Sequence, residues 1–208
     1  MDKLSPRVKR QVAEGVSFLK SGGVVAFPTD TVYGLGCDYR SREAVARLYE
    51  LKGRPTRMAL PLLLWGIGQI DEVALSVPEV ARRLAAEFLP GALTLVLKKR
   101  PSVPDFITAG GDTVAVRVPA HPVPVALARG LGVPIVGTSA NLSGRPSALT
   151  AEEVCAELGS RVDMVIDGGS VPGGKESTIV DVSGQTPVIL REGAITRAEL
   201  ERVCPQLA

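Results

Sequence analysis

Apolar residues near the start of the chain recur every three or four positions. Ser5 and Pro6 have the form of a helix N-cap followed by proline at the first helical position. The apolar residues that follow are spaced as on one face of a helix: Val8, Val12, Val16 and Leu19. Two glycines at 22–23 end the run. The pattern predicts an opening amphipathic helix.

Helical and strand-like patterns alternate along the rest of the chain. Helical spacing recurs over residues 41–51, 78–88 and 123–129, and Thr-x-x-Glu capping boxes at 150–153 and 196–199 start two further predicted helices. Predicted strands cover residues 24–28, 60–64, 93–99, 113–118, 162–167, 177–182 and 187–190, and within residues 134–141 a further strand runs into a polar loop. This mixture predicts an α/β fold with helices packed on a sheet. Because no stretch reads as a linker, we expect one domain over residues 1–208.

Composition and charge restrict the function classes only moderately. Hydrophobic residues make up 45% of the 208 residues and charged residues 22%, which is typical of a globular protein. Aromatic residues are 4%, too few for a surface that stacks several bases, and a net charge of +2 does not indicate a polyanion partner. Three distant cysteines fit neither a disulfide framework nor a zinc site, and the chain lacks a signal-peptide pattern or a long apolar stretch. We expect a cytoplasmic protein without membrane association.

Polar loops adjoin several of the predicted strands. The strand at 24–28 runs into Thr-Asp-Thr at 29–31, the strand that begins at Pro134 runs into Thr-Ser-Ala-Asn at 138–141, and Ser177 and Thr178 begin a third strand. Open α/β sheets often hold ligands at such strand ends. Lys52 and Arg54 follow a predicted helix and could reach one polyanion from a turn, although compensation of the helix dipole is the simpler role. Arg117 points away from the apolar face of its strand.

Several common kinds of catalytic site have no support. His121 is the single histidine, and it lies in a proline-rich turn, which favours a structural role. No G-x-S-x-G, H-E-x-x-H or Cys/His cluster occurs. Residues 169–175 match the glycines and lysine of a P-loop, but Glu176 replaces the required Ser or Thr and a strand follows. We interpret this segment, 168–176, as a hairpin or a lid.

A set of motifs in fixed order resembles a known family. The motifs are FPTDTVYGLG, ELKGRP, PGALTLVLKK, DTVAVRVPAHP, GTSANLSGRPS, ESTIVDV and ILREGAIT. Together they resemble the YrdC-like family of threonylcarbamoyl-AMP synthases over roughly residues 10–197. The resemblance implies a twisted, open mixed α/β sheet with a central substrate cavity, in the short single-domain form.

The resemblance also implies an activity. Members join L-threonine, bicarbonate or carbon dioxide, and ATP into threonylcarbamoyl-AMP and pyrophosphate, with Mg²⁺ accompanying ATP. Partner proteins then use the adenylate to modify tRNA. By the same resemblance, the residues that contact threonine are Thr31, Arg117 and Ser177. Those that hold ATP are Lys52, Arg54, Thr113, Ser139, Asn141, Ser147 and Arg191, with Lys52 and Arg54 assigned to catalysis at the phosphates. Thr138 belongs to the same loop without an assigned role.

One region departs from the family pattern. Met58 stands where many members have a polar residue, and Leu63 stands where some have histidine. Either Arg57 supplies the missing nucleotide contact or that side of the phosphate pocket is weaker. Two alternatives to the synthase remain: a non-catalytic module that binds double-stranded RNA or tRNA through basic runs, and a YrdC-like paralogue with another acceptor.

Overall fold

The computed structural model describes residues 4–208. Its α-helices are α1 (Pro6–Lys20), α2 (Arg42–Lys52), α3 (Ile70–Val73), α4 (Glu79–Phe88), α5 (Pro122–Leu131), α6 (Ala151–Leu158) and α7 (Arg197–Val203). Two short 3₁₀ helices are η1 (Ile67–Gln69) and η2 (Gly159–Arg161). The strands are β1 (Val25–Phe27), β2 (Gly34–Gly36), β3 (Leu62–Leu63), β4 (Leu93–Lys98), β5 (Thr113–Arg117), β6 (Ile135–Val136), β7 (Thr138–Ser139), β8 (Met164–Val165), β9 (Thr178–Asp181) and β10 (Val188–Arg191).

The helices begin at the caps that the sequence predicts. The Ser5 hydroxyl accepts a hydrogen bond from the backbone N–H of Val8 at the start of α1, and a complete capping box starts α7. At α6 the predicted box is only half formed. Thr150 accepts from the N–H of Glu153, but the Glu153 carboxylate accepts from the N–H of Leu149 rather than that of Thr150. His121 is the N-cap of α5, where its Nδ1 accepts from the N–H of Val123.

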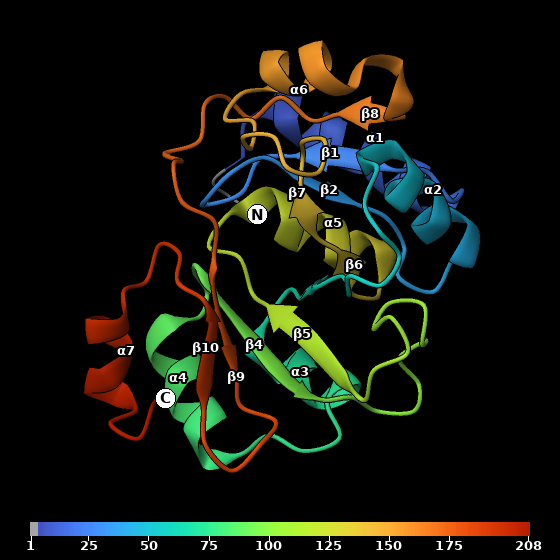
Figure 1. Ribbon diagram of the computed structural model, residues 1–208. Helices are drawn as coiled ribbons and strands as arrows, with labels where there is room; N and C mark the ends of the chain where they lie inside the picture. Colours follow the sequence, from blue (N-terminus) through green and yellow to red (C-terminus); the bar gives the residue numbers. More distant parts are fainter. Residues whose placement is uncertain (1–3) are drawn as a thin grey trace.

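The strands form two mixed sheets (Figure 1). The four-stranded sheet has the order β7-β2-β1-β8, and the six-stranded sheet has the order β10-β9-β4-β5-β3-β6. Each sheet contains both parallel and antiparallel pairs, such as β1 with β8 and β1 with β2. The predicted mixed α/β class with packed helices is confirmed. The division of the strands between two sheets is a feature that the hydrophobic pattern did not indicate.

Gly137 lies where the chain passes from one sheet to the other. Residues 134–141 were expected to form a strand that runs into a polar loop. The strand is β6 of the six-stranded sheet, but Thr138 and Ser139 of the expected loop form β7 in the four-stranded sheet. A Cβ atom on Gly137 would lie 2.3 Å from Cγ of Leu63, so a side chain does not fit at the crossing. This glycine permits the close approach that ends β6 and begins β7.

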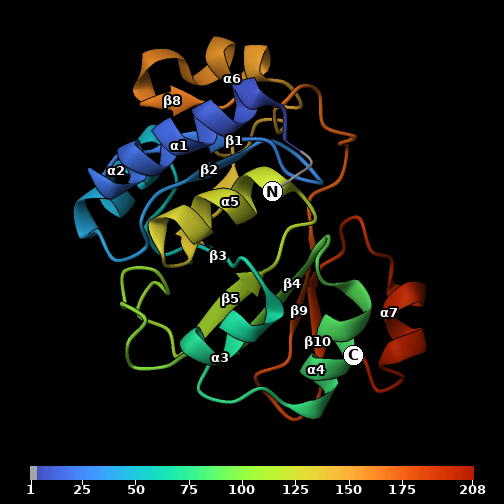
Figure 2. The ribbon, with the colours of Figure 1, turned by 180° about the vertical axis from the view of Figure 1, so that it is seen from behind.

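The central strands of the six-stranded sheet present different faces to the core and to a cavity. Leu93, Leu95 and Leu97 of β4 are buried in the main hydrophobic cluster, together with residues of α4 and α7. Figure 2 shows α3 and α4 over this side of the sheet. The alternating residues of β4, Thr94 and Val96, line a cavity on the opposite side. The period of two along a strand therefore separates the core from the site.

A second hydrophobic cluster joins two helices to the four-stranded sheet. It contains Val12 and Leu19 of α1, Leu127 of α5 and Phe27 of β1. Helices α1 and α5 lie side by side across this face (Figure 2). The cluster fixes β1, and with it the polar turn that follows the strand.

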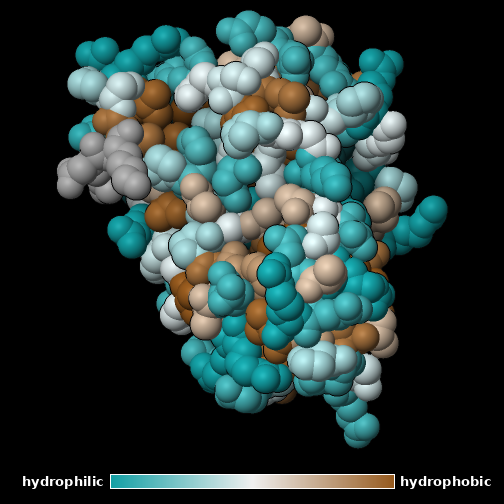
Figure 3. Space-filling model, turned by 90° about the vertical axis from the view of Figure 1, so that its left-hand side faces the viewer, coloured by the Kyte–Doolittle hydropathy of each residue, from teal (hydrophilic) through white to brown (hydrophobic). Residues whose placement is uncertain are grey.

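Large apolar residues exposed on the surface are few. On the side shown in Figure 3, small apolar patches lie between hydrophilic side chains. The large hydrophobic residues exposed in the structure are Met58, Ile67, Leu75, Val188 and Leu190. Within residues 4–208, no helix is both long and apolar enough to cross a membrane.

Candidate active site

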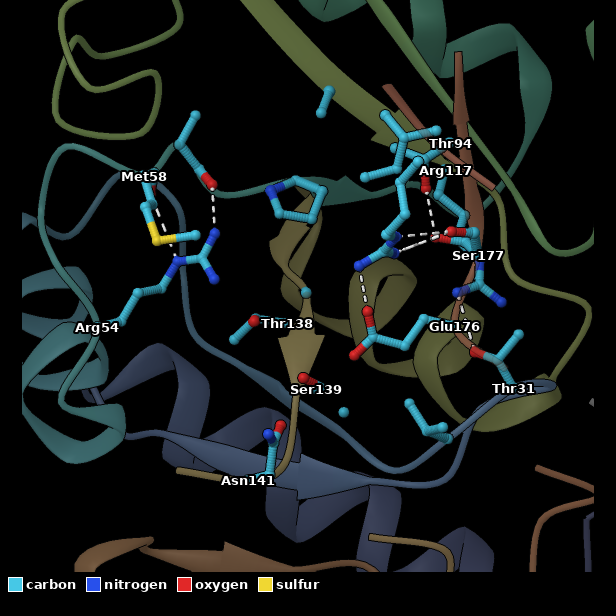
Figure 4. Close-up of a pocket in the computed structure, with 18 of the residues that line it drawn as sticks. Thr31, Arg54, Met58, Thr94, Arg117, Thr138, Ser139, Asn141, Glu176 and Ser177 are labelled. Carbon is cyan, nitrogen blue, oxygen red and sulfur yellow. Dashed lines mark hydrogen bonds and ion pairs between the residues drawn. The ribbon is translucent and has the colours of Figure 1, made fainter. Parts of the chain in front are cut away.

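A cavity of about 540 Å³ lies between the two sheets, within the size range of small-molecule sites. Its walls come from β4, β5 and β9 of one sheet, from the turn after β1, and from the loop around β7. Figure 4 shows Arg54 and Met58 on one side, Thr138 and Ser139 in the middle, and Thr31, Arg117 and Ser177 on the other side.

The charge of the lining residues is strongly one-sided. The cations are Lys52, Arg54, Arg117, Arg145 and Arg191, whereas Glu176 is the one carboxylate among the residues that line the cavity. Clefts lined by one sign of charge concentrate ligands of the other sign. The arrangement suits a ligand with several negative charges.

Arg117 is the most deeply buried of these cations after Lys52. Its Nη2 donates to Oδ1 of Asp30 at 2.7 Å, its Nη1 to Oγ1 of Thr31 at 3.1 Å, and its Nε to the carbonyl oxygen of Gly91 at 3.0 Å. Burial lowers the pKa of Arg117, and the Asp30 carboxylate opposes this effect. A guanidinium has five N–H groups. Two remain for a ligand, one on each terminal nitrogen, which is the arrangement that a carboxylate accepts.

The turn after β1 holds the hydroxyl of Thr31 beside Arg117. Thr29 Oγ1 accepts from the backbone N–H groups of Thr31 and Val32 and lies 3.0 Å from Thr31 Oγ1. Both threonines are buried. The polar Thr-Asp-Thr sequence therefore supplies its own turn and leaves Thr31 facing the cavity.

Ser177 lies on the same side of the cavity as Thr31. Its Oγ is 2.8 Å from Oγ1 of Thr94 on β4, and the residue is buried. Because either hydroxyl can donate, the pair offers a donor and acceptors to a ligand.

Lys52 ends α2 with its ammonium group buried. The helix stops at Gly53, which has the left-handed backbone conformation with φ of 56°. Lys52 Nζ donates to the carbonyl oxygens of Ser139 at 2.5 Å and Asn141 at 2.7 Å, with Asn141 Oδ1 at 3.4 Å. Burial, followed by repulsion from Arg54, lowers the pKa of Lys52 to about 8. The lysine thus fixes the loop after β7 to the end of α2.

Arg54 lies beyond the helix end and is half-buried. Its Nη2 donates to the carbonyl oxygen of Ala59 at 3.0 Å, and its Nε lies 3.5 Å from that of Met58. Burial lowers the pKa of this guanidinium, while Tyr49 and Glu176 raise it. The remaining N–H groups of Arg54 are available on the side of the cavity opposite Arg117 (Figure 4).

Most of the predicted site residues meet at this cavity. Those that line it are Thr31, Lys52, Arg54, Arg117, Thr138, Ser139, Asn141, Ser177 and Arg191. Ser147 does not line it, but its Oγ donates to Oε1 of Glu176 at 3.0 Å. Thr113 is placed elsewhere: it begins β5, at the end away from Arg117, and pairs with Lys98. The structure does not bring Thr113 to the cavity.

The region that departs from the family pattern lies at one side of the cavity. Met58 lines the cavity and is 45% exposed, whereas Arg57 is exposed and lies outside the lining. Because Arg57 lies outside the lining, the geometry favours the weaker phosphate pocket, with Met58 as an apolar wall, over a nucleotide contact from Arg57. Residues 169–175 form a loop that leads into β9 without a helix. A P-loop would need a helix there, so its rejection from the sequence agrees with the structure.

Among the polar and charged residues that line the cavity, Thr94, Arg145 and Glu176 were not assigned to the site from the sequence. Thr94 could have been found, because it is a polar residue on the face opposite to the leucines of β4. Glu176 was considered only as the residue that breaks the P-loop pattern. Nothing in its local sequence indicates that the chain brings it to Arg191.

The chain is similar in sequence to known proteins. The sequence matches the family described as Telomere recombination, Sua5/YciO/YrdC, over residues 17–193. A threonylcarbamoyl-AMP synthase of Bacillus subtilis is 43% identical over 194 residues, which cover 93% of this chain and 56% of that protein.

Two solved structures are similar over most of the chain. Pyrococcus abyssi Sua5 complexed with L-threonine superposes with a TM-score of 0.91 at 41% identity, covering 95% of this chain and 58% of that one. YciO of E. coli superposes with a TM-score of 0.82 at 32% identity, covering 89% and 90%. The chain thus spans a little over half the length of the Bacillus subtilis and Pyrococcus abyssi relatives, at 56% and 58%.

Proposed function

The chain belongs to the Sua5/YciO/YrdC family, and we propose that it condenses L-threonine, bicarbonate or carbon dioxide, and ATP to threonylcarbamoyl-AMP and pyrophosphate. The observation that carries the proposal is the meeting of Thr31, Arg54, Arg117, Ser139 and Ser177 at one cavity. The synthase names of the similar proteins and the threonine bound to Pyrococcus abyssi Sua5 support it.

Threonine is proposed to bind on the side of Arg117. The two N–H groups that Arg117 does not use within the protein would hold the substrate carboxylate. The hydroxyls of Thr31 and Ser177 lie beside it and offer hydrogen bonds to the amino acid. A site that hydrogen-bonds a polar group discriminates strongly against ligands without that group.

ATP is proposed to bind toward Arg54 and the loop after β7. Arg54, Ser139 and Asn141 line this part of the cavity. Arg191, also proposed to hold ATP, lines the cavity beside Ser177, and Ser147 contacts Glu176 there. Lys52 would act there in two ways, by fixing the loop through the carbonyl groups of Ser139 and Asn141 and by adding positive charge near the phosphates.

The proposed reaction needs no protein nucleophile. The amine of threonine adds to carbon dioxide and releases its protons to solvent. A carbamate oxygen then attacks the α-phosphorus of ATP, and pyrophosphate leaves with the electrons of the broken P–O bond. Negative charge grows on the phosphate oxygens, so positioning and fixed cations are the means of catalysis available to Arg54 and Lys52.

Mg²⁺ is proposed to enter with ATP and to neutralise charge on its phosphates. The donor set fits an ion that keeps phosphate and water ligands, because hydroxyls, Asn141 and the single carboxylate of Glu176 are the oxygen groups that face the cavity. The product would pass to partner proteins that modify tRNA. Because the proposed reaction uses ATP and serves tRNA, we propose a cytoplasmic location.

Mass spectrometry of the product tests the proposal directly. Incubation with ATP, Mg²⁺, bicarbonate and L-threonine should give threonylcarbamoyl-AMP, and pyrophosphate release should require both threonine and bicarbonate. Release of pyrophosphate when both threonine and bicarbonate are absent would indicate a different reaction. A module that only binds RNA would instead show RNA affinity that falls steeply with salt and no turnover of ATP.

A further inference from the structure

Glu176 contacts two of the residues assigned to ATP. Its Oε1 accepts from the hydroxyl of Ser147 at 3.0 Å, and its Oε2 is ion-paired with Nη1 of Arg191. These partners come from different parts of the chain, since Ser147 follows β7 of the four-stranded sheet and Arg191 ends β10 of the six-stranded sheet. Figure 4 shows the carboxylate directed into the cavity.

The donor hydrogens that Glu176 engages cannot serve a ligand at the same time. A serine hydroxyl has one hydrogen, and in the structure Ser147 gives it to Glu176. Arg191 is similarly occupied: Nε and Nη2 donate to Ser177, so Nη1 is the nitrogen left for a ligand. One of its two hydrogens faces Glu176.

A carboxylate at this position also opposes the field of the cavity. It is the single anion among lining residues that include five cations. Its negative charge therefore repels a phosphate approaching the groups that it now holds. Yet each of its oxygens has a partner of the type that a phosphate would use, a hydroxyl and a guanidinium.

We propose that Glu176 is a resident anion that occupies the place of a substrate phosphate and must release Ser147 and Arg191 before that phosphate can bind. The proposal rests on the proposed use of ATP, and it adds a residue that sets the affinity and selectivity of the phosphate site. When the phosphate takes both donors, the carboxylate swings away and the 168–176 loop loses its contact with Ser147.

Isothermal titration with inorganic pyrophosphate, without Mg²⁺, tests the proposal. Glu176→Gln keeps the size of the side chain but removes its charge, so pyrophosphate should bind about tenfold more tightly than to the wild type. L-threonine affinity should stay within about twofold, because the groups proposed to hold threonine are unchanged. If Glu176 had only a structural role, its substitution would weaken the binding of pyrophosphate and of L-threonine together.

The matched control is Glu192→Gln. Glu192 is one residue beyond Arg191, is exposed and does not line the cavity, so its loss changes the net charge equally without freeing a donor. Its pyrophosphate affinity should equal that of the wild type within about twofold. Glu176→Ala gives a second measurement, because it frees both donors completely and should also bind pyrophosphate more tightly.

The outcomes separate this inference from the proposed function. If the wild type forms threonylcarbamoyl-AMP and both folded Glu176 variants bind pyrophosphate equally or less tightly, the resident-anion role is wrong. If pyrophosphate binds more tightly to the variants but no adenylate is made, the resident anion stands and the proposed reaction falls.

Discussion

At the scale of single residues, Lys52 is buried and its ammonium group donates hydrogen bonds to oxygen atoms of β7 and the loop after it. The residue is 3% exposed, and its ammonium group is held by the carbonyl groups of Ser139 and Asn141. Burial lowers its pKa to about 8 from 10.5 in an exposed lysine. Between these values the unfolded chain binds one more proton than the folded protein does. The free energy of unfolding therefore rises with pH in this window.

Lys52→Met should remove this pH dependence. From pH 7.5 to 9.5 the wild type should gain about 2 kcal/mol relative to the variant, as the cost of a buried charge disappears. Urea unfolding gives the free energy of unfolding of both proteins at both pH values. The change with pH in the variant is subtracted from that in the wild type, so the titration of tyrosines and cysteines cancels. Parallel pH profiles of the two proteins would contradict the lowered pKa.

Arg117 can be tested without leaving its partner unpaired. Removal of the whole side chain would strand the carboxylate of Asp30, which is 16% exposed. Arg117→Lys keeps the charge but loses the planar fork. We expect kcat/KM for L-threonine to fall about 10²-fold while KM for ATP is unchanged. Arg40→Lys is the matched control, because Arg40 pairs with Asp38 at 2.8 Å outside the cavity. Equal effects of the two substitutions would contradict the threonine contact.

Individual site residues were predictable where a family motif carries them. Thr31, Arg54 and Ser177 lie at the cavity as expected, although what they bind stays a prediction. Thr113 was expected at the same place because it shares a motif with Arg117. The strand separates them, since residues four apart on a strand lie roughly 13 Å apart. Glu176 escaped prediction because its partners are 29 and 15 residues away along the chain.

At the scale of elements, helices were easier to predict than strands. Caps such as Ser5 and the Thr196 box are local, so the sequence indicates where α1 and α7 begin. Strands of two or three residues depend on their neighbours. The crossing at Gly137 depends on Leu63, more than seventy residues earlier, so the local sequence indicated a polar loop at residues 138–141 and no second strand.

Gly137→Ala should therefore disturb both stability and the site. Its Cβ would lie 2.3 Å from Leu63 Cγ, so we expect a loss of roughly 1–3 kcal/mol in urea unfolding, with reduced activity because Thr138 and Ser139 follow directly. Gly68→Ala is the control, because a Cβ there meets nothing within 4 Å. Adding Leu63→Ala removes the clashing atoms, so the double variant should lose less than the sum of the single losses. Additive losses would contradict the clash.

At the scale of the whole molecule, the site is built from both sheets. Lys52 and Asn141 belong to the side of the four-stranded sheet, while Arg117 and Ser177 belong to the six-stranded sheet. A ligand that fills the cavity contacts both halves and binds the folded chain only. Its binding should therefore stabilise the protein as a whole.

Thermal unfolding with each ligand separately tests this view of the site. At about 100 times the dissociation constant, a ligand adds about 2.7 kcal/mol, which for a chain of this size raises Tm by roughly 5–10 °C. Because Arg54 and Arg117 lie on opposite sides of the cavity, Arg54→Ala should lose the shift produced by ATP and keep the shift produced by L-threonine. Arg117→Lys should do the reverse. Variants that each lose both shifts would mean that the two guanidinium groups serve one ligand, and the division of the cavity into a nucleotide side and an amino-acid side would be wrong.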